Sequence, residues 1–298
     1  MQGDLDVVTS SIFLFKFADD TKGIKVIKDE CCSRELQEAL NNLFAWSEEW
    51  QMLFNADKCH IIHLGRTNPN YPYFINGSGL AVVDEEKDLG VLIHKSCTPS
   101  SQVAKAAKKG NSILGQLIRA VSYRDKFTYI KLYKEFVRPH LEYAVQTWSP
   151  WLQRDIDLLE DVQRRAVRAV SGLTGSYSDK LTILKLPSLI TRRERGDMIQ
   201  TFKIINRLDN VDPANYFEFV ANHHNHAKRQ GVVIEAPIPH EDNVAIPTTN
   251  LVVQNGNLDL RRNFFTHRVV NKWNNLDQSI KTAASLNEFK NKYDASLD

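Results

Sequence analysis

Hydrophobic residues follow two patterns along the chain, and the pattern changes near residue 99. In the first part they form short apolar or aromatic runs between turn residues, which predicts short strands. The run Ile12-Phe13-Leu14-Phe15-Lys16-Phe17 predicts a buried strand, with a return strand near 23–28. Leucines at helical spacing predict one amphipathic helix at 33–53, with Ser33 as its N-cap. Further strands are expected at 59–64, 73–75 and 89–93.

In the second part apolar positions recur every three to four residues, which predicts helices joined by short connections. Pro139 is expected to stop the second of these helices. Residues 210–260 are irregular and rich in Pro and Asn, with short strands expected at 232–234 and 251–253. The expected helices are 102–121, 126–137, 141–148, 152–170, 192–207, 264–273 and 286–293. The pattern as a whole predicts an α+β protein.

Composition places the chain among globular proteins. Its 298 residues are 42% hydrophobic, which is ordinary for a protein with a core. There is no run of about 18 apolar residues that would predict a membrane helix, and the acidic N-terminus lacks the basic start of a signal peptide. The four cysteines form no Cys-x-x-Cys pair. They are expected to be reduced thiols in a cytoplasmic or nuclear protein that is not secreted.

Charge is distributed unevenly, although the net charge is only +2. Residues 1–95 contain nine Lys/Arg against fifteen Asp/Glu, whereas residues 102–138 contain nine Lys/Arg against two acids. A cationic segment after an acidic one suits a second part that binds a nucleic-acid backbone. Lysines on a solvated helix face are the alternative interpretation.

Two adjacent acids, Asp19 and Asp20, follow the first predicted strand and are expected at the tip of a hairpin. Mg²⁺ prefers carboxylate oxygens and is often bound by one or two carboxylates plus substrate phosphates. In a two-metal site of nucleotidyl transfer, the ions activate the attacking oxygen and stabilise the leaving one. Asp also tolerates turn backbone, so the pair alone leaves a metal site and a plain turn both open.

Further motifs follow Phe17-Ala18-Asp19-Asp20 in a fixed order. A tryptophan-rich segment ends in Asn55, Lys58 and Cys59, and a Leu-Gly motif follows at Leu89-Gly90. The remaining motifs lie at 137–143 with 148–150, 159–166, 184–189 with 192–198, and 268–276. Together these segments resemble the reverse transcriptases of non-LTR (LINE-type) retrotransposons, especially the jockey-like and chicken-repeat-like groups, over nearly the whole chain.

The resemblance implies a fold and a domain organisation. Residues 1–95 would be a partial polymerase palm, an antiparallel sheet with a packed helix that carries the Asp-Asp hairpin. Residues 96–208 would be a mainly α-helical thumb and connected bundle. Residues 209–298 would be an irregular segment and C-terminal helices.

The same resemblance implies an RNA-directed DNA polymerase, a nucleotidyltransferase. Asp19 and Asp20 would help to bind two Mg²⁺ (or Mn²⁺) ions, and Lys58 would lie near the nucleotide phosphates and help the leaving pyrophosphate. An exposed loop lysine is the alternative for Lys58. The implied partners are an RNA template, a DNA primer and deoxynucleotide triphosphates, with no membrane. The lysines expected to contact the primer–template backbone are Lys105, Lys108 and Lys109.

One departure from the family limits the expected activity. Family members place another catalytic Asp and the fingers upstream of the Asp-Asp motif, and this sequence begins too late to contain either. Metal binding is therefore expected to be weak or absent, and the polypeptide alone inactive as a polymerase. The alternative is a non-catalytic nucleic-acid-binding remnant that uses the basic thumb helices. A third reading is a degenerate product without function.

Histidines and tryptophans offer other candidate sites, which the spacing disfavours. His60 and His63 are three apart in a predicted strand and point to opposite faces, so they would not share a zinc ion. His223, His224 and His226 lie in a predicted loop without a nearby Cys or acid. Trp46 and Trp50 share a helix face and are expected to pack in the core rather than to stack on bases.

Overall fold

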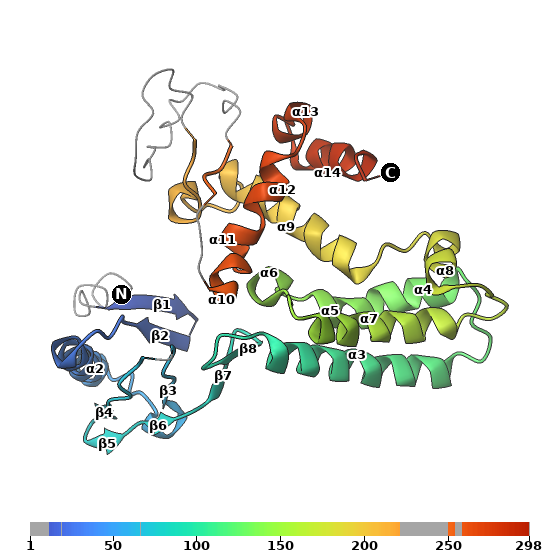
Figure 1. Cartoon of the computed structure of the whole chain (residues 1–298). Helices are drawn as coiled ribbons and strands as arrows, with labels where there is room; N and C mark the ends of the chain where they lie inside the picture. The colour runs from blue at the N-terminus through green and yellow to red at the C-terminus, as the bar shows by residue number, and fades with distance from the viewer. Residues whose placement is uncertain (1–11, 19, 66, 221–249, 254–257, 298) are drawn as a thin grey trace. The chain divides into compact units, whose positions relative to one another are not determined.

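The computed structural model describes residues 12–18, 20–65, 67–220, 250–253 and 258–297. The chain forms two compact units, Met1–Ser101 and Gln102–Asp298 (Figure 1). Strands and one long helix make up the described part of the first unit, and helices dominate the second. This composition confirms the α+β class. The assignment of the two units to a palm and a thumb stays a prediction.

The first unit opens with an antiparallel hairpin of β1 (Phe13–Phe17) and β2 (Asp20–Ile24). Phe17 pairs directly with Asp20, so the return strand begins at once and the expected strand near 23–28 is placed too late. The prediction that the first strand is buried is also wrong. Phe13, Phe15 and Phe17 are 68%, 53% and 64% exposed, because alternate residues of a strand share one face and this face is uncovered.

Helix α2 (Glu30–Glu49) begins earlier than its leucine pattern indicates. Asp29 is the N-cap, and its side chain accepts a hydrogen bond from the backbone N–H of Cys32 at 2.9 Å. Ser33 is therefore not the cap. It lies inside the helix, where its buried hydroxyl donates to the Tyr73 hydroxyl oxygen at 3.2 Å. Leu36, Leu40 and Phe44 of α2 pack on a small core of Tyr73, Ile75 and Leu80.

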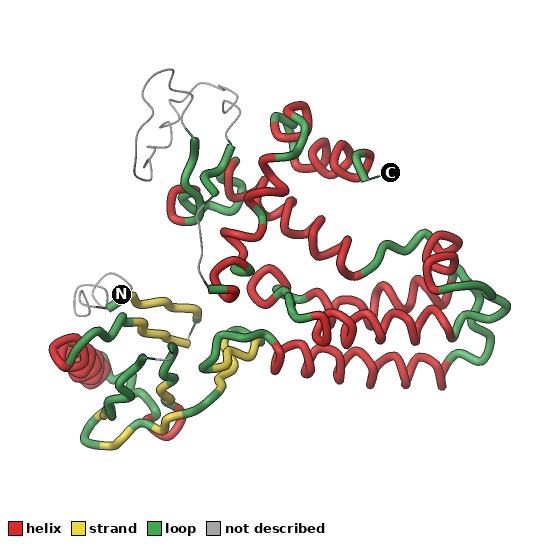
Figure 2. The backbone as a smooth tube through the Cα atoms, in the orientation of Figure 1, coloured by secondary structure: helices red, strands yellow, loops and turns green. Residues whose placement is uncertain are grey.

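The remaining strands of the first unit are short segments separated by loops, as Figure 2 shows. The described strands pair in four separate two-stranded ladders, one of which is parallel, and not in one antiparallel sheet. Turn residues interrupt the chain between 65 and 79, and Asn70, Asn76 and Gly77 have positive φ angles that end extended structure. The short pairs are β3 (His60–Ile61) with β6 (Ala81–Val82), β4 (Phe74–Ile75) with β5 (Ser78–Gly79), and β7 (Glu85–Asp88) with β8 (Val91–His94).

Helix α3 (Ser100–Ala120) packs through small residues in the second unit. Ala106, Ala107 and Gly110 are buried together with Val103 and Leu114. A Cβ atom at Gly110 would lie 2.8 Å from Cδ2 of Leu141 and 3.4 Å from Cγ1 of Val162. The missing side chain therefore lets α3 approach both α5 (Arg138–Glu142) and α7 (Gln153–Arg168) closely.

Pro139 does not stop the helical path, contrary to expectation. Helix α4 (Thr128–Leu132) runs through a π-helical turn (Tyr133–Val137) into α5, and Pro139 occupies the first turn of α5. Proline lacks the N–H that the interior of an α-helix needs, and here it follows a π-helical turn, which already departs from the regular α-helical hydrogen-bonding pattern. The chain turns instead at Ala144, whose φ is 50°, before α6 (Val145–Trp148).

A second core joins α9 (Leu189–Ile205) to the C-terminal helices. Phe202 of α9 stacks on Phe289 with 4.4 Å between ring centroids, and Trp273 and Tyr293 pack beside Phe289. The expected strand at 251–253 is a single bridge between Leu251 and Phe219, and the one at 232–234 lies outside the described residues. The other elements are α8 (Tyr177–Leu184), α10 (Asp259–Arg262), α11 (Phe265–Arg268), α12 (Val270–Asn274), α13 (Gln278–Lys281) and α14 (Leu286–Ala295).

Candidate functional site

The hairpin places one of the two expected metal ligands in solvent. Asp20 is the first residue of β2, opposite Phe17, and is exposed. Asp19 lies outside the described residues. Ala18 has a φ of 52°, which costs a non-glycine residue about 1–3 kcal/mol. Two-residue hairpin loops demand a positive φ at their first position, so the turn itself explains this strain.

Lys58 lies in a separate, short element. It ends a 3₁₀ turn (Ala56–Lys58) that Asn55 caps by accepting a hydrogen bond from the backbone N–H of Asp57 at 3.1 Å. The Lys58 residue is exposed. Within the described part of the chain, no hydrogen bond or ion pair joins Lys58 to Asp20. The structure thus leaves the catalytic role of Lys58 a prediction.

A metal centre needs more ligands than the described hairpin provides. Mg²⁺ takes about six oxygen ligands, and Asp20 contributes a single carboxylate. Over the described ranges, no group of three or more His, Cys, Asp or Glu side chains could hold a metal ion. His60 is engaged elsewhere, with its Nδ1 2.7 Å from Oε2 of Glu86. The histidines at 223–226 lie outside the described residues. Asp19 is not among these described donors, so the fit of the Asp19–Asp20 pair to the expected ion stays a prediction.

Two of the three expected nucleic-acid-binding lysines are accessible on α3. Lys108 and Lys109 are exposed, and Lys105 is half-buried one turn earlier. Residues three and four apart on a helix are neighbours on its surface, so the three lysines form one stripe. The opposite side of the helix carries the buried small residues Ala106, Ala107 and Gly110. The small-residue face therefore packs against neighbouring helices, while Lys108 and Lys109 remain exposed.

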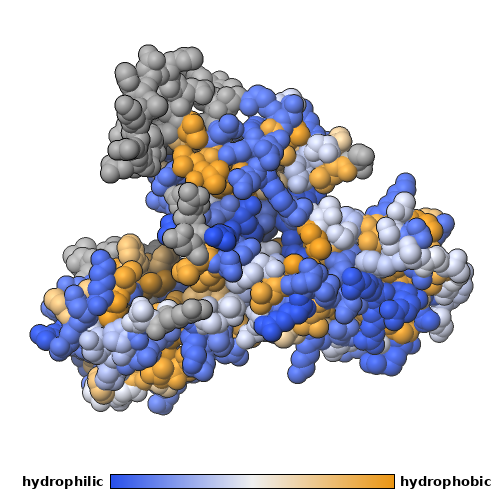
Figure 3. Space-filling view, viewed as in Figure 1, coloured by the Kyte–Doolittle hydropathy of each residue, from blue (hydrophilic) through white to orange (hydrophobic). Residues whose placement is uncertain are grey.

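Arginines of α7 extend this stripe. Arg165 is exposed and donates from Nη1 to Oδ1 of Asn111 on α3 at 3.2 Å, and the exposed Arg168 follows three residues later. We call Lys105, Lys108, Lys109, Arg165 and Arg168 the α3–α7 basic surface. The side of α3 and α7 that faces the viewer in Figure 3 is largely hydrophilic. Sequence reasoning assigned no role to these arginines, although their positions opposite the buried face of α7 were a usable signal.

Other basic residues of the 102–138 segment have structural roles. Arg124 donates from Nε to the Ala169 carbonyl at 2.8 Å and from Nη1 to the Val121 carbonyl at 3.0 Å, so it ties the end of α3 to the end of α7. Arg138 is half-buried beside Glu142, and burial lowers the pKa of Arg138. The basic count of the segment thus overstates the charge available to a ligand.

Trp46 and Trp50 share one face of α2, as predicted, with 6.3 Å between their ring centroids. Trp46 is half-buried, but Trp50 is 40% exposed at the end of the helix. The prediction of core packing is therefore wrong for Trp50.

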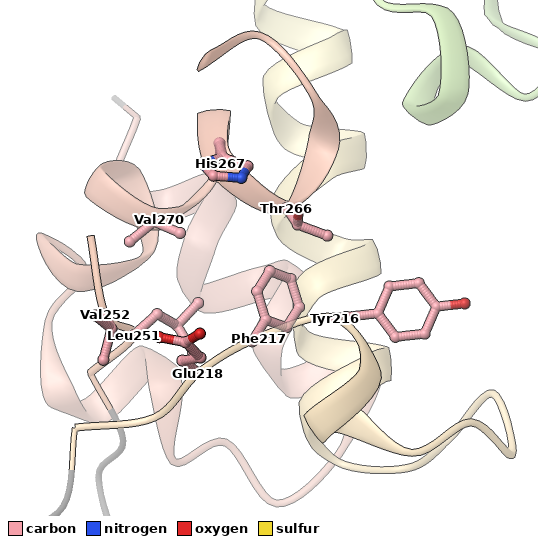
Figure 4. A pocket seen from close by; sticks show the side chains of 8 residues that line it. All are labelled: Tyr216, Phe217, Glu218, Leu251, Val252, Thr266, His267 and Val270. Atoms are coloured by element: carbon pink, nitrogen blue, oxygen red, sulfur yellow. The ribbon is translucent and has the colours of Figure 1, made fainter. Parts of the chain in front are cut away.

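A small cavity of about 20 Å³ lies in the second unit (Figure 4). It has room for about one water molecule, which needs roughly 10–15 Å³ of such space. It is therefore too small for a nucleotide. Its lining residues are Tyr216, Phe217, Glu218, Leu251, Val252, Thr266, His267 and Val270.

Cys31, Cys32, Cys59 and Cys97 are all unpaired, and burial raises the pKa of the Cys59 and Cys97 thiols. Among the described helices, none is both long and apolar enough to cross a membrane.

The features so far define a class: an α+β protein with an exposed hairpin that carries Asp20 and with a basic helical unit. Comparison with known proteins adds a similarity to two curated polymerases. The chain is 27% identical over 169 residues to the RNA-directed DNA polymerase from mobile element jockey of Drosophila funebris, which is 54% of this chain and 18% of that protein. It is 24% identical over 217 residues to the corresponding polymerase of Drosophila melanogaster, which is 70% of this chain and 23% of that protein.

These matches confirm the resemblance to jockey-like non-LTR retrotransposon reverse transcriptases. The chain matches about a fifth of the length of these curated relatives. No protein-family model matches it. No solved structure matches it either.

Proposed function

We propose that this chain is part of an RNA-directed DNA polymerase of a jockey-like retrotransposon. The observation that carries this proposal is the hairpin, which exposes Asp20 directly after the aromatic strand in a chain similar to jockey polymerases. Asp19 and Asp20 are its proposed contribution to metal binding, and Lys58 its proposed charge for the leaving pyrophosphate. Its partners would be an RNA template, a DNA primer and deoxynucleotide triphosphates.

The polypeptide alone is proposed to lack polymerase activity. Nucleotidyl transfer by two metals needs ligands that hold both ions in place. The described residues offer the single carboxylate of Asp20 and, in these ranges, no cluster of three ligands. Metal binding by the isolated chain is proposed to be weak or absent, because the two carboxylates of Asp19 and Asp20 without a third ligand would hold the ions weakly.

Primer extension tests this proposal. The full chain is incubated with an annealed RNA template and DNA primer, deoxynucleotide triphosphates and Mg²⁺ or Mn²⁺, and no extension is expected. Metal-dependent synthesis that Asp19→Asn abolishes, while the exposed-acid control Glu85→Gln leaves it intact, would show that the isolated chain is a working polymerase.

The second candidate function is nucleic-acid binding without catalysis, and the α3–α7 basic surface favours it. Lys108 and Lys109 project from one helix, and Arg165 projects from its neighbour. Phosphate contacts by such side chains give affinity that is independent of sequence and falls with salt, because bound counterions are released.

Binding to a short RNA–DNA duplex at several salt concentrations tests this second function. The double variant Lys108→Glu/Lys109→Glu is expected to bind more weakly by a similar factor on different sequences and to show a shallower salt dependence. The control Lys28→Glu/Lys87→Glu makes the same net-charge change at exposed residues of the first unit. Equal losses in both double variants would contradict a specific role of the α3–α7 basic surface.

A further inference from the structure

A second cavity lies within the helical unit, beside α9 and the turn between α5 and α6. Its volume is about 140 Å³, about ten times the ~10–15 Å³ that one water molecule needs. Three arginines of α9 line it, against one carboxylate from α5. We call it the arginine pocket, and the residues that matter for its chemistry are Glu142, Gln146, Arg192, Arg193, Arg195 and Gly196.

Arg193 is the unusual member of the arginine pocket. It is only 5% exposed, yet its side chain makes no hydrogen bond or ion pair with any residue in the described part of the chain. Burial lowers the pKa of Arg193, and the charges of the Glu160 and Asp197 carboxylates act on this pKa in the opposite direction. Arginine nevertheless stays charged in proteins, so the pocket wall contains a largely buried cation to which the described residues make no hydrogen bond or ion pair.

The acids near Arg193 are each bound to another group. Asp197 accepts two hydrogen bonds from Arg268, both at 2.8 Å. Glu160 accepts from the backbone N–H of Leu189 at 3.0 Å and from the Tyr177 hydroxyl. Both carboxylates therefore spend hydrogen-bonding capacity on groups other than the Arg193 guanidinium.

Glu142, the one acid in the wall of the pocket, is likewise engaged. Its two oxygens accept hydrogen bonds from Nε and Nη2 of Arg192. Arg195 binds Asp294 in the same two-pronged way. A guanidinium has five N–H donors, so Arg192 and Arg195 each keep donors that these ion pairs do not use.

The backbone keeps the arginine pocket open. A Cβ atom at Gly196 would lie 3.3 Å from Nε2 of Gln146, on the opposite wall. The absence of a side chain at this position leaves space between α9 and Gln146. The pocket therefore has a cationic wall, unused donors and room for a small anion.

We infer that the arginine pocket binds a phosphate group, with the guanidinium of Arg193 as its principal ligand. A phosphate would give this buried cation the charge-assisted, bidentate hydrogen bonds that arginine forms with oxyanions. The phosphate could belong to a small phosphorylated molecule or to a nucleic-acid backbone. Phosphate binding is independent of the polymerase assignment, because the pocket lies in the helical unit and its chemistry needs no metal.

Two titrations of the full chain distinguish the sources. Isothermal titration calorimetry with inorganic phosphate, against chloride at equal ionic strength, measures the free anion. Fluorescence anisotropy with a 12-base-pair RNA–DNA duplex measures backbone phosphate. Arg193→Met is expected to weaken binding at least tenfold in one or both titrations. The exposed control Arg207→Met, which removes the same charge just beyond the end of α9, is expected to bind like wild type.

Each outcome has a definite meaning. Loss of inorganic phosphate binding alone assigns the pocket to a small phosphorylated ligand. If duplex binding is weakened instead, and the slope of log binding constant against log salt concentration is smaller by about one, the arginine pocket binds one backbone phosphate. Arg193→Lys keeps the positive charge but loses the planar guanidinium with its paired N–H donors, so this variant is also expected to bind phosphate more weakly. It provides the test if Arg193→Met does not fold. Unchanged binding in both titrations overturns the inference and leaves the polymerase proposal untouched.

Discussion

At Gly110 the backbone of α3 comes so close to its neighbours that a methyl group does not fit. The nearest atom to an added Cβ would be Cδ2 of the buried Leu141, at 2.8 Å. Replacing glycine by alanine in a helix gains up to about 1 kcal/mol in propensity, whereas overpacking a core costs about 1–3 kcal/mol. Gly110→Ala is therefore expected to lower the free energy of unfolding by about 1 kcal/mol in urea denaturation.

Gly115 on the same helix supplies a matched control. The nearest atom to an added Cβ there is Nη1 of Arg119, at 3.6 Å, so no clash opposes the gain in helix propensity. Gly115→Ala is expected to raise the free energy of unfolding by about 0.5–1 kcal/mol. A Gly110→Ala variant as stable as Gly115→Ala would contradict the close packing of α3.

Asp209 is expected to make stability depend on pH at the acid side. A hydrogen bond from Lys203 at 2.7 Å, supported by one from Gln200, lowers the pKa of Asp209 below its ordinary value of 3.8. A carboxylate with a lowered folded-state pKa contributes stability above its unfolded pKa and loses it as the pH falls through the folded value. Asp209→Asn is therefore expected to destabilise the protein at pH 7, with a smaller difference below about pH 4.

Urea denaturation of the wild type and Asp209→Asn at pH 7, 5 and 3 measures this difference. The free energies of unfolding of the two proteins should differ by a similar amount at pH 7 and pH 5, because at both pH values the Asp209 carboxylate is ionised in the folded and in the unfolded state. A difference that stays constant down to pH 3 would mean that the Lys203 contact contributes nothing to stability.

Single charged residues show what sequence reasoning could and could not assign. The lysine stripe at Lys108 and Lys109 follows from helical spacing, since the buried alanines beside it are visible in the sequence. The structural role of Arg124 could not be distinguished from the role of these exposed lysines, because the carbonyl to which Arg124 donates, that of Ala169, lies 45 residues away in the sequence. The hydrogen bonds of Asp197 to Arg268 and of Glu160 to the Leu189 N–H link distant parts of the chain, so no local pattern shows that these acids near Arg193 are already engaged.

At the scale of elements, the exposed face of β1 sets it apart from a core strand. Phe15 is more than half exposed, whereas Ile75 of β4 in the same unit is buried. Truncating a buried aliphatic side chain to alanine costs about 2–5 kcal/mol, and surface substitutions usually stay within about 0.5 kcal/mol. Phe15→Ala is therefore expected to leave the stability of the first unit nearly unchanged, and Ile75→Ala to lower it by at least about 2 kcal/mol.

Hydrogen exchange in the first unit measures both variants, with protection of the α2 amides as the readout. The phenylalanines of β1 also form an exposed apolar row, so Phe15→Ala is expected to bind a hydrophobic dye less than wild type. A loss of α2 protection in Phe15→Ala as large as that in Ile75→Ala would show that the aromatic face is covered in solution.

Elements with a regular spacing of apolar residues could be predicted from the sequence. Elements whose structure or burial depends on residues elsewhere in the chain could not. The apolar spacing predicted the buried side chains of Leu159, Val162 and Ala166 on α7 correctly, but it wrongly included Leu158, which is 39% exposed. The prediction that Pro139 stops the helix was wrong, because the place of Pro139 in α5 depends on the π-helical turn before it. The burial of β1 was overestimated because an aromatic run shows only which residues share a face, while burial depends on what packs against that face.

At the scale of the whole molecule, the two units differ in the size of their described cores. In the first unit Tyr73, Ile75 and Leu80 form the fully buried cluster, with partly buried side chains of α2 around it. In the second unit one cluster alone contains fifteen buried residues, with Phe202, Trp273 and Phe289 at its centre. The stabilisation from burial scales with the apolar area removed from water, so the second unit is expected to gain more stability from its core than the first.

This asymmetry predicts that the chain unfolds in two steps, with the first unit unfolding at the lower denaturant concentration. Multi-domain chains commonly depart from two-state behaviour, and local stability follows the density of buried contacts. Hydrogen exchange followed by mass spectrometry across a urea series measures both units in one sample. Peptides from α2 are expected to lose protection before peptides from α9, and Ile75→Ala should shift only the first transition. A single transition shared by both helices, moved as a whole by Ile75→Ala, would instead show that the two units unfold as one cooperative body.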